Sequence, residues 1–323
     1  DNSRNLAENF DYRVFSRLTG YGNETASYDE KGNITEKTDV GSFEYSHPEK
    51  PYAITGVSLA TNSIPSISQD IAYTSFSRPK QITENGKTAT FTYNAAFDRV
   101  KMMVSDCGKS ILTRYYLGNC YELEVADNIH KETLYLCGDY YSAPAVVVKH
   151  SLFAETGPKY PASVLNDIDI QEPSPGIGDM SEEAPNYRLY FIIRDYLGSV
   201  THVVSSLNGK IEQELGYDAW GQLRHPSTLE TYSPGKEPAL FLGRGYTGHE
   251  HLPLFGLINM NARLYDPVLG RFLSPDQFVQ NYDWLQNYNR YTYALNNPLC
   301  YLDEAGCIVC AVVGVAAVLG GVV

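Results

Sequence analysis

The stretch "YDEKGNITEKTDVGSFEY", residues 28–45, carries the pattern that decides the fold class. In its middle, Lys31-Gly32-Asn33 supplies turn residues between two short runs of residues that favour strands. After that turn, Phe43 and Tyr45 alternate with polar neighbours, so both aromatic side chains point to the same face of a strand. The stretch therefore predicts a β-hairpin with one apolar face.

Related units lie on both sides of this hairpin. They read "FDYRVFSRLTGYGN" from Phe10, "AYTSFSRPKQITENGKTATFTY" from Ala72 and "YNAAFDRVKMMVSDCGKSILTRYYLG" from Tyr93, and each joins an aromatic start to an Asn, Asp or Gly turn. A single hairpin cannot bury its apolar face, so neighbouring hairpins must pair edge to edge into a long curling sheet. We therefore predict an all-β fold, with antiparallel hairpins over most of residues 1–150 forming a shell with a concave face.

The strand pattern stops between residues 151 and 186. Five prolines fall there among acidic and small residues, and a proline-dense stretch cannot sustain a β-ladder. This range is predicted to be a linker or an insertion. Beyond it, "YRLYFIIRDYLGSVTHVVSSLNGKIEQELGYDAWGQLR", from Tyr187, restores strands, with a turn at residues 207–209. Short helices are expected only near residues 282–294.

The composition limits the partners that the chain can bind. Its formal net charge of −13 and its pI near 5 oppose attraction to nucleic acid or to an anionic membrane, because either partner requires a positive patch. The six cysteines are too sparse for a disulfide framework and leave the redox compartment open. The apolar residues 307–323 reach only the lower length limit of a membrane span and lack flanking charges, which favours a truncated buried segment. The missing initiator Met suggests a fragment.

Four sequence blocks in the last part of the chain carry a family resemblance. They are "RDYLGSV" at 194–200, "YDAWGQL" at 217–223, "GYTGHEHLPLFGLINMNARLYDPVLGRFLSPD" at 245–276 and "NRYTYALNNPLCYLDEAG" at 289–306. In this order they resemble the RHS (rearrangement hotspot) or YD-repeat family of bacterial polymorphic toxins, and in particular the core domain that follows the repeats. The long ordered string is highly specific, whereas each hairpin before residue 150 is a weak match by itself.

The resemblance implies a domain plan and a function. The plan has a YD-repeat β-shell at residues 1–150, a linker or insertion at 151–186, an RHS repeat-associated core domain at 187–306, and the start of a truncated variable segment at 307–323. The repeats would form part of a spiralling cocoon that the core closes. Such a shell encloses and presents a C-terminal effector in cis, often a toxin, until delivery.

The implied setting is a secreted or cell-surface bacterial protein. Its further partners would be a secretion apparatus and an immunity protein, and the only enzymatic activity expected is cleavage of its own chain. The residues also allow a different function. Tyr occurs 26 times, and Tyr-rich sheet faces suit an extracellular β-scaffold or adhesin that binds glycans or other cells.

In some members of the family, the core cleaves the chain just after itself with two aspartates, each in a D-P-x-G motif. Asp276 and Asp303 match those positions, and the cut would fall near Cys307. This is the aspartic-protease arrangement, in which one of two close carboxyl groups stays protonated while the other activates water. The chain departs from the motif: Gln-Phe-Val follows Asp276, Glu-Ala-Gly follows Asp303, and Cys307 stands where Leu is expected. The alternative is that both aspartates only cap turns beside Pro275 and Gly306.

Three other motifs are read as structural. The string "GRGYTG" at 243–248 matches the G-x-G-x-x-G fingerprint, but the next residues contain a proline and a glycine that would break the helix a dinucleotide needs. His249 and His251 alternate on a strand with Glu250 opposite, which favours hydrogen-bonded structural roles over a helical metal site. Cys307-x-x-Cys310 has no second pair. We therefore predict no metal and no cofactor.

Four large side chains lie between the turn signals of the last two blocks. We expect these four to be largely buried, because the core must close the shell and these side chains supply apolar area. They are Tyr265, Leu273, Tyr291 and Tyr293.

Overall fold

A computed structural model of the 323-residue chain describes residues 7–60, 68–127, 129–152, 187–233, 235–279, 281–307 and 310–311. The predicted linker or insertion at 151–186 lies almost wholly outside the described residues, as does most of the predicted segment at 307–323. Within the described ranges, every regular element is a β-strand or a short 3-10 helix. The all-β prediction is confirmed.

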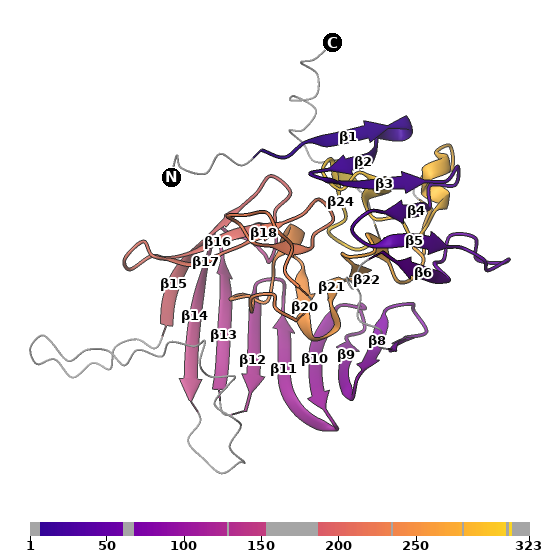
Figure 1. Ribbon diagram of the computed structural model, residues 1–323. Coiled ribbons are helices and arrows are strands. Elements are labelled where there is room, and N and C mark those ends of the chain that lie inside the picture. The colour runs from indigo at the N-terminus through magenta and orange to yellow at the C-terminus, as the bar shows by residue number, and fades with distance from the viewer. Residues whose placement is uncertain are drawn as a thin grey trace, which may run out of the picture.

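The first six strands form an antiparallel sheet in which each strand pairs with the next along the chain (Figure 1). Tight turns make this possible. Between β3 and β4, for example, Gly32 takes a left-handed φ of 79°, which residues with a Cβ atom rarely adopt. The strands are β1 (Phe10–Arg13), β2 (Arg17–Tyr21), β3 (Glu24–Tyr28), β4 (Ile34–Lys37), β5 (Gly41–Glu44) and β6 (Gly56–Leu59), and the 3-10 helix η1 (Val14–Ser16) joins the first two.

The next eleven strands form one large antiparallel sheet, again in chain order. The predicted hairpins of residues 1–150 are therefore present in both sheets. Strands β15–β17, which the domain plan placed in the core domain, pair with the preceding strands in this sheet. The strands are β7 (Gln69–Tyr73), β8 (Pro79–Glu84), β9 (Lys87–Tyr93), β10 (Arg99–Asp106), β11 (Lys109–Leu117), β12 (Tyr121–Ala126), β13 (Ile129–Leu136), β14 (Ala145–Leu152), β15 (Tyr187–Arg194), β16 (Val200–Ser205) and β17 (Ile211–Glu214).

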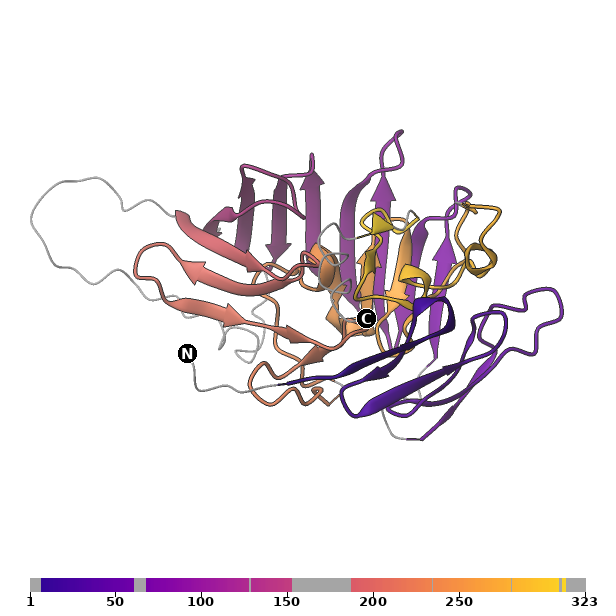
Figure 2. The same ribbon diagram turned by 90° about the horizontal axis from the view of Figure 1, so that it is seen from above.

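Alternate residues of the large sheet point to opposite faces, as a pleated strand requires. On β11, Arg114 and Tyr116 are buried, whereas Tyr115 and Leu117 are 36% and 58% exposed. The buried face packs against the C-terminal part of the chain, around which the sheet curves (Figure 2). The two sheets together thus form a shell with its apolar face inward.

The remaining elements are short and lie inside the curve of the shell (Figures 1 and 2). They include three small sheets, β18–β19, β20–β23 and β24–β25. The sequence predicts short helices only near residues 282–294. The 3-10 helix η5 and the start of η6 lie there, but η1, η3 and η4 do not, so the restriction to that range is wrong. The elements are β18 (Gly216–Tyr217), β19 (Leu223–Arg224), η3 (Tyr246–Gly248), β20 (Glu250–Leu252), η4 (Pro253–Phe255), β21 (Leu257–Met260), β22 (Arg263–Asp266), β23 (Arg271–Phe272), η5 (Leu285–Tyr288), η6 (Ala294–Asn296), β24 (Tyr301–Leu302) and β25 (Cys310–Ala311).

An aromatic cluster fills the centre of this C-terminal part. Tyr265 and Tyr293 are both 0% exposed, and their ring centroids lie 4.5 Å apart. The burial prediction is confirmed in full for these two residues, whereas Leu273 and Tyr291 are less deeply buried than Tyr265 and Tyr293. Leu273 lies one residue beyond β23, and Tyr291 precedes the bridge that Thr292 forms with Arg271, so both lie where strand pairing ends.

Buried ions join the shell to the C-terminal part. Glu250 on β20 is 0% exposed, and its carboxylate lies 2.7 Å from Arg99 Nη2 and 2.5 Å from Arg114 Nη1. The hydroxyl of Tyr116 donates a hydrogen bond to the same carboxylate at 2.6 Å. Burial alone would raise the pKa of Glu250, but the arginines hold it at about 2. The carboxylate therefore stays ionised and anchors the core to β10 and β11.

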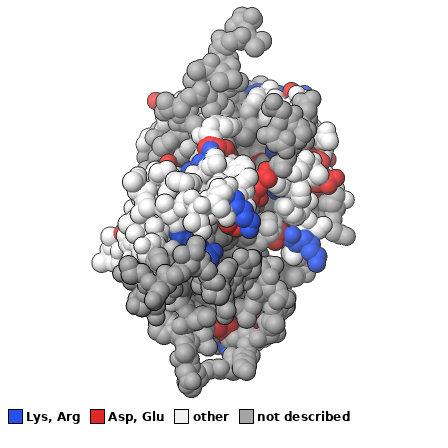
Figure 3. All heavy atoms as spheres, turned by 90° about the vertical axis from the view of Figure 1, so that its left-hand side faces the viewer, with Lys and Arg blue, Asp and Glu red and all other residues white. Residues whose placement is uncertain are grey.

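The surface carries charges of both signs. On the side shown in Figure 3, Lys and Arg side chains lie beside Asp and Glu side chains within a larger uncharged area. None of the described residues belongs to a helix with the length and apolar character of a membrane span.

Candidate active site

Asp276 lies just after β23, and the chain around it is fixed by backbone hydrogen bonds. Its N–H donates to the carbonyl of Arg290 at 2.8 Å, and Arg290 Nη1 donates back to the Asp276 carbonyl at 3.0 Å. The carboxylate Oδ1 accepts the N–H of Phe278 at 2.9 Å, which is the turn cap that Asp commonly makes. Only 8% of Asp276 is exposed, so its second carboxylate oxygen must find a partner inside the protein.

Asp303 follows β24 and is 0% exposed. Its Oδ1 accepts the N–H of Cys307 at 2.8 Å, and this bond closes the turn that ends in Gly306 and Cys307. Gly306 takes a left-handed φ of 70°, and a Cβ atom there would lie 1.9 Å from the Met260 carbonyl oxygen. Only glycine allows the turn to press so closely against β21 and β22.

Arg263 on β22 joins the two aspartates. Its Nη2 lies 3.1 Å from Asp276 Oδ2 and 2.9 Å from Asp303 Oδ2, so the two carboxylate oxygens lie no more than about 6 Å apart. Its Nε donates to the carbonyl of Gly306. The guanidinium stacks 3.5 Å above the ring of Phe272, which holds it in place. One arginine thus contacts both carboxylates and the peptide group that precedes Cys307.

The local electrostatics shift the pKa values of Asp276 and of the Cys307 thiol. Burial raises the pKa of Asp276, and the negative charge of Asp303 raises it further, although Arg263 opposes both effects. Burial also raises the pKa of the Cys307 thiol, with added contributions from the two carboxylates. Asp276 therefore holds a proton more readily than an exposed Asp does, and Cys307 stays a neutral thiol at pH 7.

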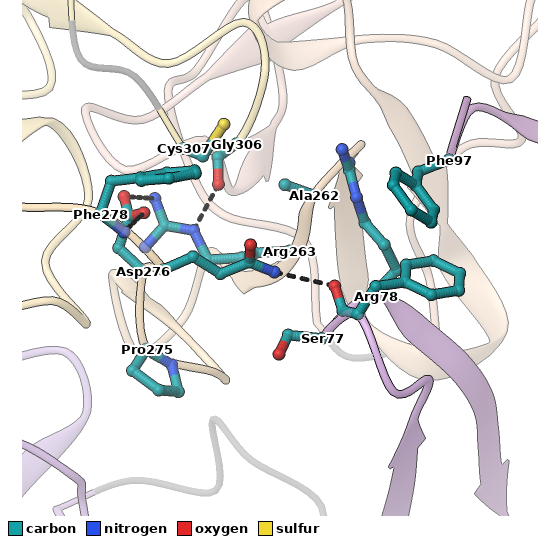
Figure 4. A pocket seen from close by; sticks show the side chains of 12 residues that line it. Ser77, Arg78, Phe97, Ala262, Arg263, Pro275, Asp276, Phe278, Gly306 and Cys307 are labelled. Carbon is teal, nitrogen blue, oxygen red and sulfur yellow. Dashed lines mark hydrogen bonds and ion pairs between the residues drawn. The ribbon is translucent and has the colours of Figure 1, made fainter. Parts of the chain in front are cut away.

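A pocket of about 120 Å³ opens beside these groups (Figure 4). One wall consists of Arg263, Asp276, Gly306 and Cys307 from the C-terminal part of the chain. The facing wall comes from two turns of the large sheet, residues 76–78 and Phe97. The site is therefore solvent-accessible and lies between two structural units.

Sequence comparisons connect this architecture to known proteins. The Teneurin YD-shell family matches residues 179–299. Salivary gland surface protein 1 of Aedes aegypti is 33% identical over 138 residues, which is 43% of this chain and 4% of that protein. The tRNA nuclease WapA of Bacillus subtilis is 24% identical over 303 residues, which is 92% of this chain and 10% of the nuclease.

Solved structures share the fold at low sequence identity. The crystal structure of TcdB2-TccC3-Cdc42 has a TM-score of 0.55 at 14% identity, covering 93% of this chain and 17% of that chain. The Photorhabdus luminescens Tc holotoxin pore has a TM-score of 0.58 at 18% identity, covering 88% and 13%. This chain has the fold of an RHS/YD-repeat shell. The resemblance found in the sequence is confirmed, and the chain spans a tenth or less of the curated relatives named above.

Within this RHS/YD shell, the predicted residues Asp276, Asp303 and Cys307 come together around one guanidinium. Sequence reasoning missed that guanidinium, Arg263, although one signal was present. Every other residue of β22 and its neighbour β21 carries an apolar or uncharged side chain apart from Asp266, so a charge in this strand requires a buried partner.

The motifs predicted to be structural have structural partners in the RHS/YD shell. The ring of His249 lies 2.8 Å from the Thr247 hydroxyl and 3.0 Å from the Glu304 carbonyl. His251 Nε2 accepts the N–H of Tyr246 at 3.0 Å. The glycine-rich string at 243–248 leads into the strand β20 and not into a helix. The Cys307-x-x-Cys310 motif lies partly outside the described residues.

Proposed function

We propose that this RHS/YD shell encloses and presents an effector segment C-terminal to its core, and that the core frees this segment by one cut beside Cys307. The shell fold supports the first part, together with similarity to Bacillus proteins named as tRNA nucleases and to Tc toxin structures. The same relatives support a secreted or cell-surface location. A secretion apparatus and an immunity protein are the partners that such a protein requires.

One observation carries the second part, namely that Asp276 and Asp303 share the guanidinium of Arg263 beside the peptide group of Cys307. The raised pKa of Asp276 assigns it the acid role. Asp303 is the base that takes a proton from water. Arg263 donates to the Gly306 carbonyl, one peptide group before the cut, and so holds the chain in place between the two carboxylates.

The proposed reaction is hydrolysis of the peptide bond that follows Cys307, since Cys307 stands where the Leu before the cut is expected. Water adds to the carbonyl carbon and gives one proton to Asp303, while Asp276 gives its proton to the departing nitrogen. The C–N bond breaks, and the products are a new carboxyl group on the shell and a new amino group on the effector segment. Each shell cuts its own chain once, so no turnover follows.

Mass spectrometry of the parent protein, extended beyond Val323, tests the cut. The wild type is expected to give two fragments, the first of which ends at Cys307. Asp276→Asn or Asp303→Asn alone should leave the chain whole, because the mechanism needs both carboxylates. Asp266→Asn is the matched control, since Asp266 also caps a turn through Oδ1 but lies outside the site. If every variant is cut at the same bond, another protease makes the cut. If the wild type stays uncut, the two aspartates are structural and the proposed self-cleavage is wrong.

Enclosure is tested separately by limited proteolysis. The effector segment is expected to resist added protease while the shell is folded and to become sensitive in urea. Rapid digestion of that segment in the folded protein, cut or uncut, would contradict enclosure.

A second function, a glycan-binding surface scaffold, is favoured by one observation. A run of aromatic and aliphatic residues in the core remains exposed and offers a stacking surface. Saturable binding of a glycan that is lost when Trp284 is replaced by Ala would support this function. The exposed residues are Phe278, Tyr282, Trp284, Leu285 and Tyr288.

A further inference from the structure

The pocket beside the two aspartates contains a residue in an unfavourable backbone conformation. Phe97, in the turn between β9 and β10, has a left-handed φ of 65°. A bulky side chain in this region of backbone space is uncommon and calls for a local reason. The reason can be sought by comparing this turn with others of the same kind.

Other turns of the described chain have the same pair of backbone hydrogen bonds, one from the first N–H to the fifth carbonyl and one from the fourth N–H to the first carbonyl. Asn94–Asp98 makes these bonds at 2.9 and 3.1 Å, and its fourth residue is Phe97. In the turns that begin at residues 29, 195, 218 and 245, the fourth residue is glycine, and in the turn that begins at residue 74 it is Ser77, with a left-handed φ of 60°. A bulky phenylalanine therefore stands where the same turn elsewhere uses glycine, which has no Cβ atom to strain, or the small residue serine.

The turn itself gains little from the ring of Phe97. The side chain is 49% exposed, so burial of apolar area does not explain its presence. Its centroid lies 4.6 Å from that of Phe76, which in turn packs edge-on against Tyr93 at 5.6 Å. The two rings thus form a fixed aromatic wall, and the space beside that wall is the pocket.

The opposite side of the pocket holds the cleavage centre. Phe278 extends the aromatic lining from the core side, and Gln277 Nε2 ties the core to the shell by donating to the Phe76 carbonyl at 2.8 Å. Cys307 lies in the same lining with its N–H held by Asp303. The volume of about 120 Å³ is several times what one water molecule needs. The pocket has room for a side chain larger than a thiol.

We propose that this pocket is the specificity subsite of the cleavage centre, that it takes the side chain of residue 307, and that Phe97 of the shell is its specificity-determining residue. The inference rests on the proposed self-cleavage. It means that the shell supplies part of the protease, since Phe76 and Phe97 come from turns of the large sheet and the aspartates come from the core. The ligand class is an apolar, unbranched or γ-branched side chain next to the cut.

The test is a double-mutant cycle on the rate of cutting in the parent protein extended beyond Val323. Cys307→Leu fills the pocket and should speed the cut, and Phe97→Gly should slow it by roughly tenfold, the scale of one lost apolar contact in a specificity pocket. In the Phe97→Gly background, the gain from Cys307→Leu should vanish. The melting temperature of Phe97→Gly should be equal to or above that of the wild type, because glycine relieves the strained φ.

Phe15→Gly is the matched control. Phe15 also has a left-handed φ, 63°, and is 58% exposed, but it lies outside the pocket. Its variant should cut at the wild-type rate. Cutting that depends on Asp276 and Asp303 supports self-cleavage. If, in addition, Phe97→Gly cuts as fast as the wild type, or the gain from Cys307→Leu persists in the Phe97→Gly background, the proposed subsite is wrong while self-cleavage stands. If the wild type stays whole, or if both aspartate variants are still cut, self-cleavage and subsite fail together.

Discussion

The large sheet and the C-terminal core use the same kinds of residue in different ways. In the sheet, neighbouring residues of one strand alternate between buried and exposed, as Tyr116 and Tyr115 do. In the core, all four residues of β21 (Leu257–Met260) are buried, and charged groups such as Glu250 and Arg263 are buried with them. The sheet is therefore held by local pairing and one apolar face, whereas the core also depends on buried polar contacts between residues far apart in the sequence.

The largest expected effect follows from the charge that joins these two regions. Glu250→Ala removes the carboxylate that binds both Arg99 and Arg114. Arg114 keeps its ion pair with Glu124, but Arg99 loses the carboxylate that compensates its buried charge, so we expect a loss of about 3–5 kcal/mol in the free energy of unfolding. Urea denaturation followed by circular dichroism measures it. Glu132→Ala is the control in the sheet, because its partner Lys149 is exposed and the loss should stay below about 1 kcal/mol. If Glu250→Ala and Glu132→Ala lose the same free energy of unfolding, the buried ions of the core are no more important for stability than an exposed ion pair of the sheet.

The aromatic cluster gives the next effect. Tyr265→Ala or Tyr293→Ala should each cost about 2–4 kcal/mol, because both rings are fully buried and the cavity cannot collapse. Thermal unfolding of the two variants, compared with Tyr115→Ala on the outer face of the sheet, is the measurement. Unchanged melting for both core variants would mean that the cluster does not hold the core together.

This contrast also explains what the sequence could predict. The hairpins followed from turn residues such as Gly32 and from alternation over residues 28–45, because those signals are local. Asp276 and Asp303 were found through the family resemblance, but their common partner Arg263 was not, since it lies 13 and 40 residues before them and meets them only in the fold. Phe97 was also missed, because a strained backbone angle leaves no mark on a sequence pattern.

Buried histidines and aspartates of the C-terminal part should make the stability of the protein depend on pH. Burial lowers the pKa of His249 to about 3 and of His251 to about 4. Between pH 6.5 and these values the unfolded chain binds more protons than the folded chain, so these histidines make stability fall as the pH falls. Burial raises the pKa of Asp218 and Asp266 to about 6, so between pH 6 and 3.8 they act in the opposite direction.

The two opposing effects predict a shallow slope of stability between pH 6 and 4 and a steeper loss between pH 4 and 3, where His249 and Glu250 act without opposition. Each group contributes at most about 1.4 kcal/mol per pH unit. Urea denaturation at several pH values measures the slope. Replacing Asp218 and Asp266 by Asn should steepen it between pH 6 and 4, and a stability that rises steadily down to pH 3 would contradict the assignment.

The smallest effect compares two adjacent tyrosines on β11. The hydroxyl of Tyr116 points inward and donates to Glu250 at 2.6 Å, whereas Tyr115 lies on the outer face. Tyr116→Phe keeps the ring that Arg99 covers at 4.4 Å and removes only the hydrogen bond to a buried carboxylate, so the expected loss is about 1.5 kcal/mol. Tyr115→Phe should change stability by less than about 0.5 kcal/mol, because Tyr115 is exposed and its hydroxyl group is not needed to satisfy a buried charge. Both values come from urea denaturation of the same protein preparation. If the two variants lose the same amount, the buried carboxylate does not need the third donor, and the two arginines alone stabilise it.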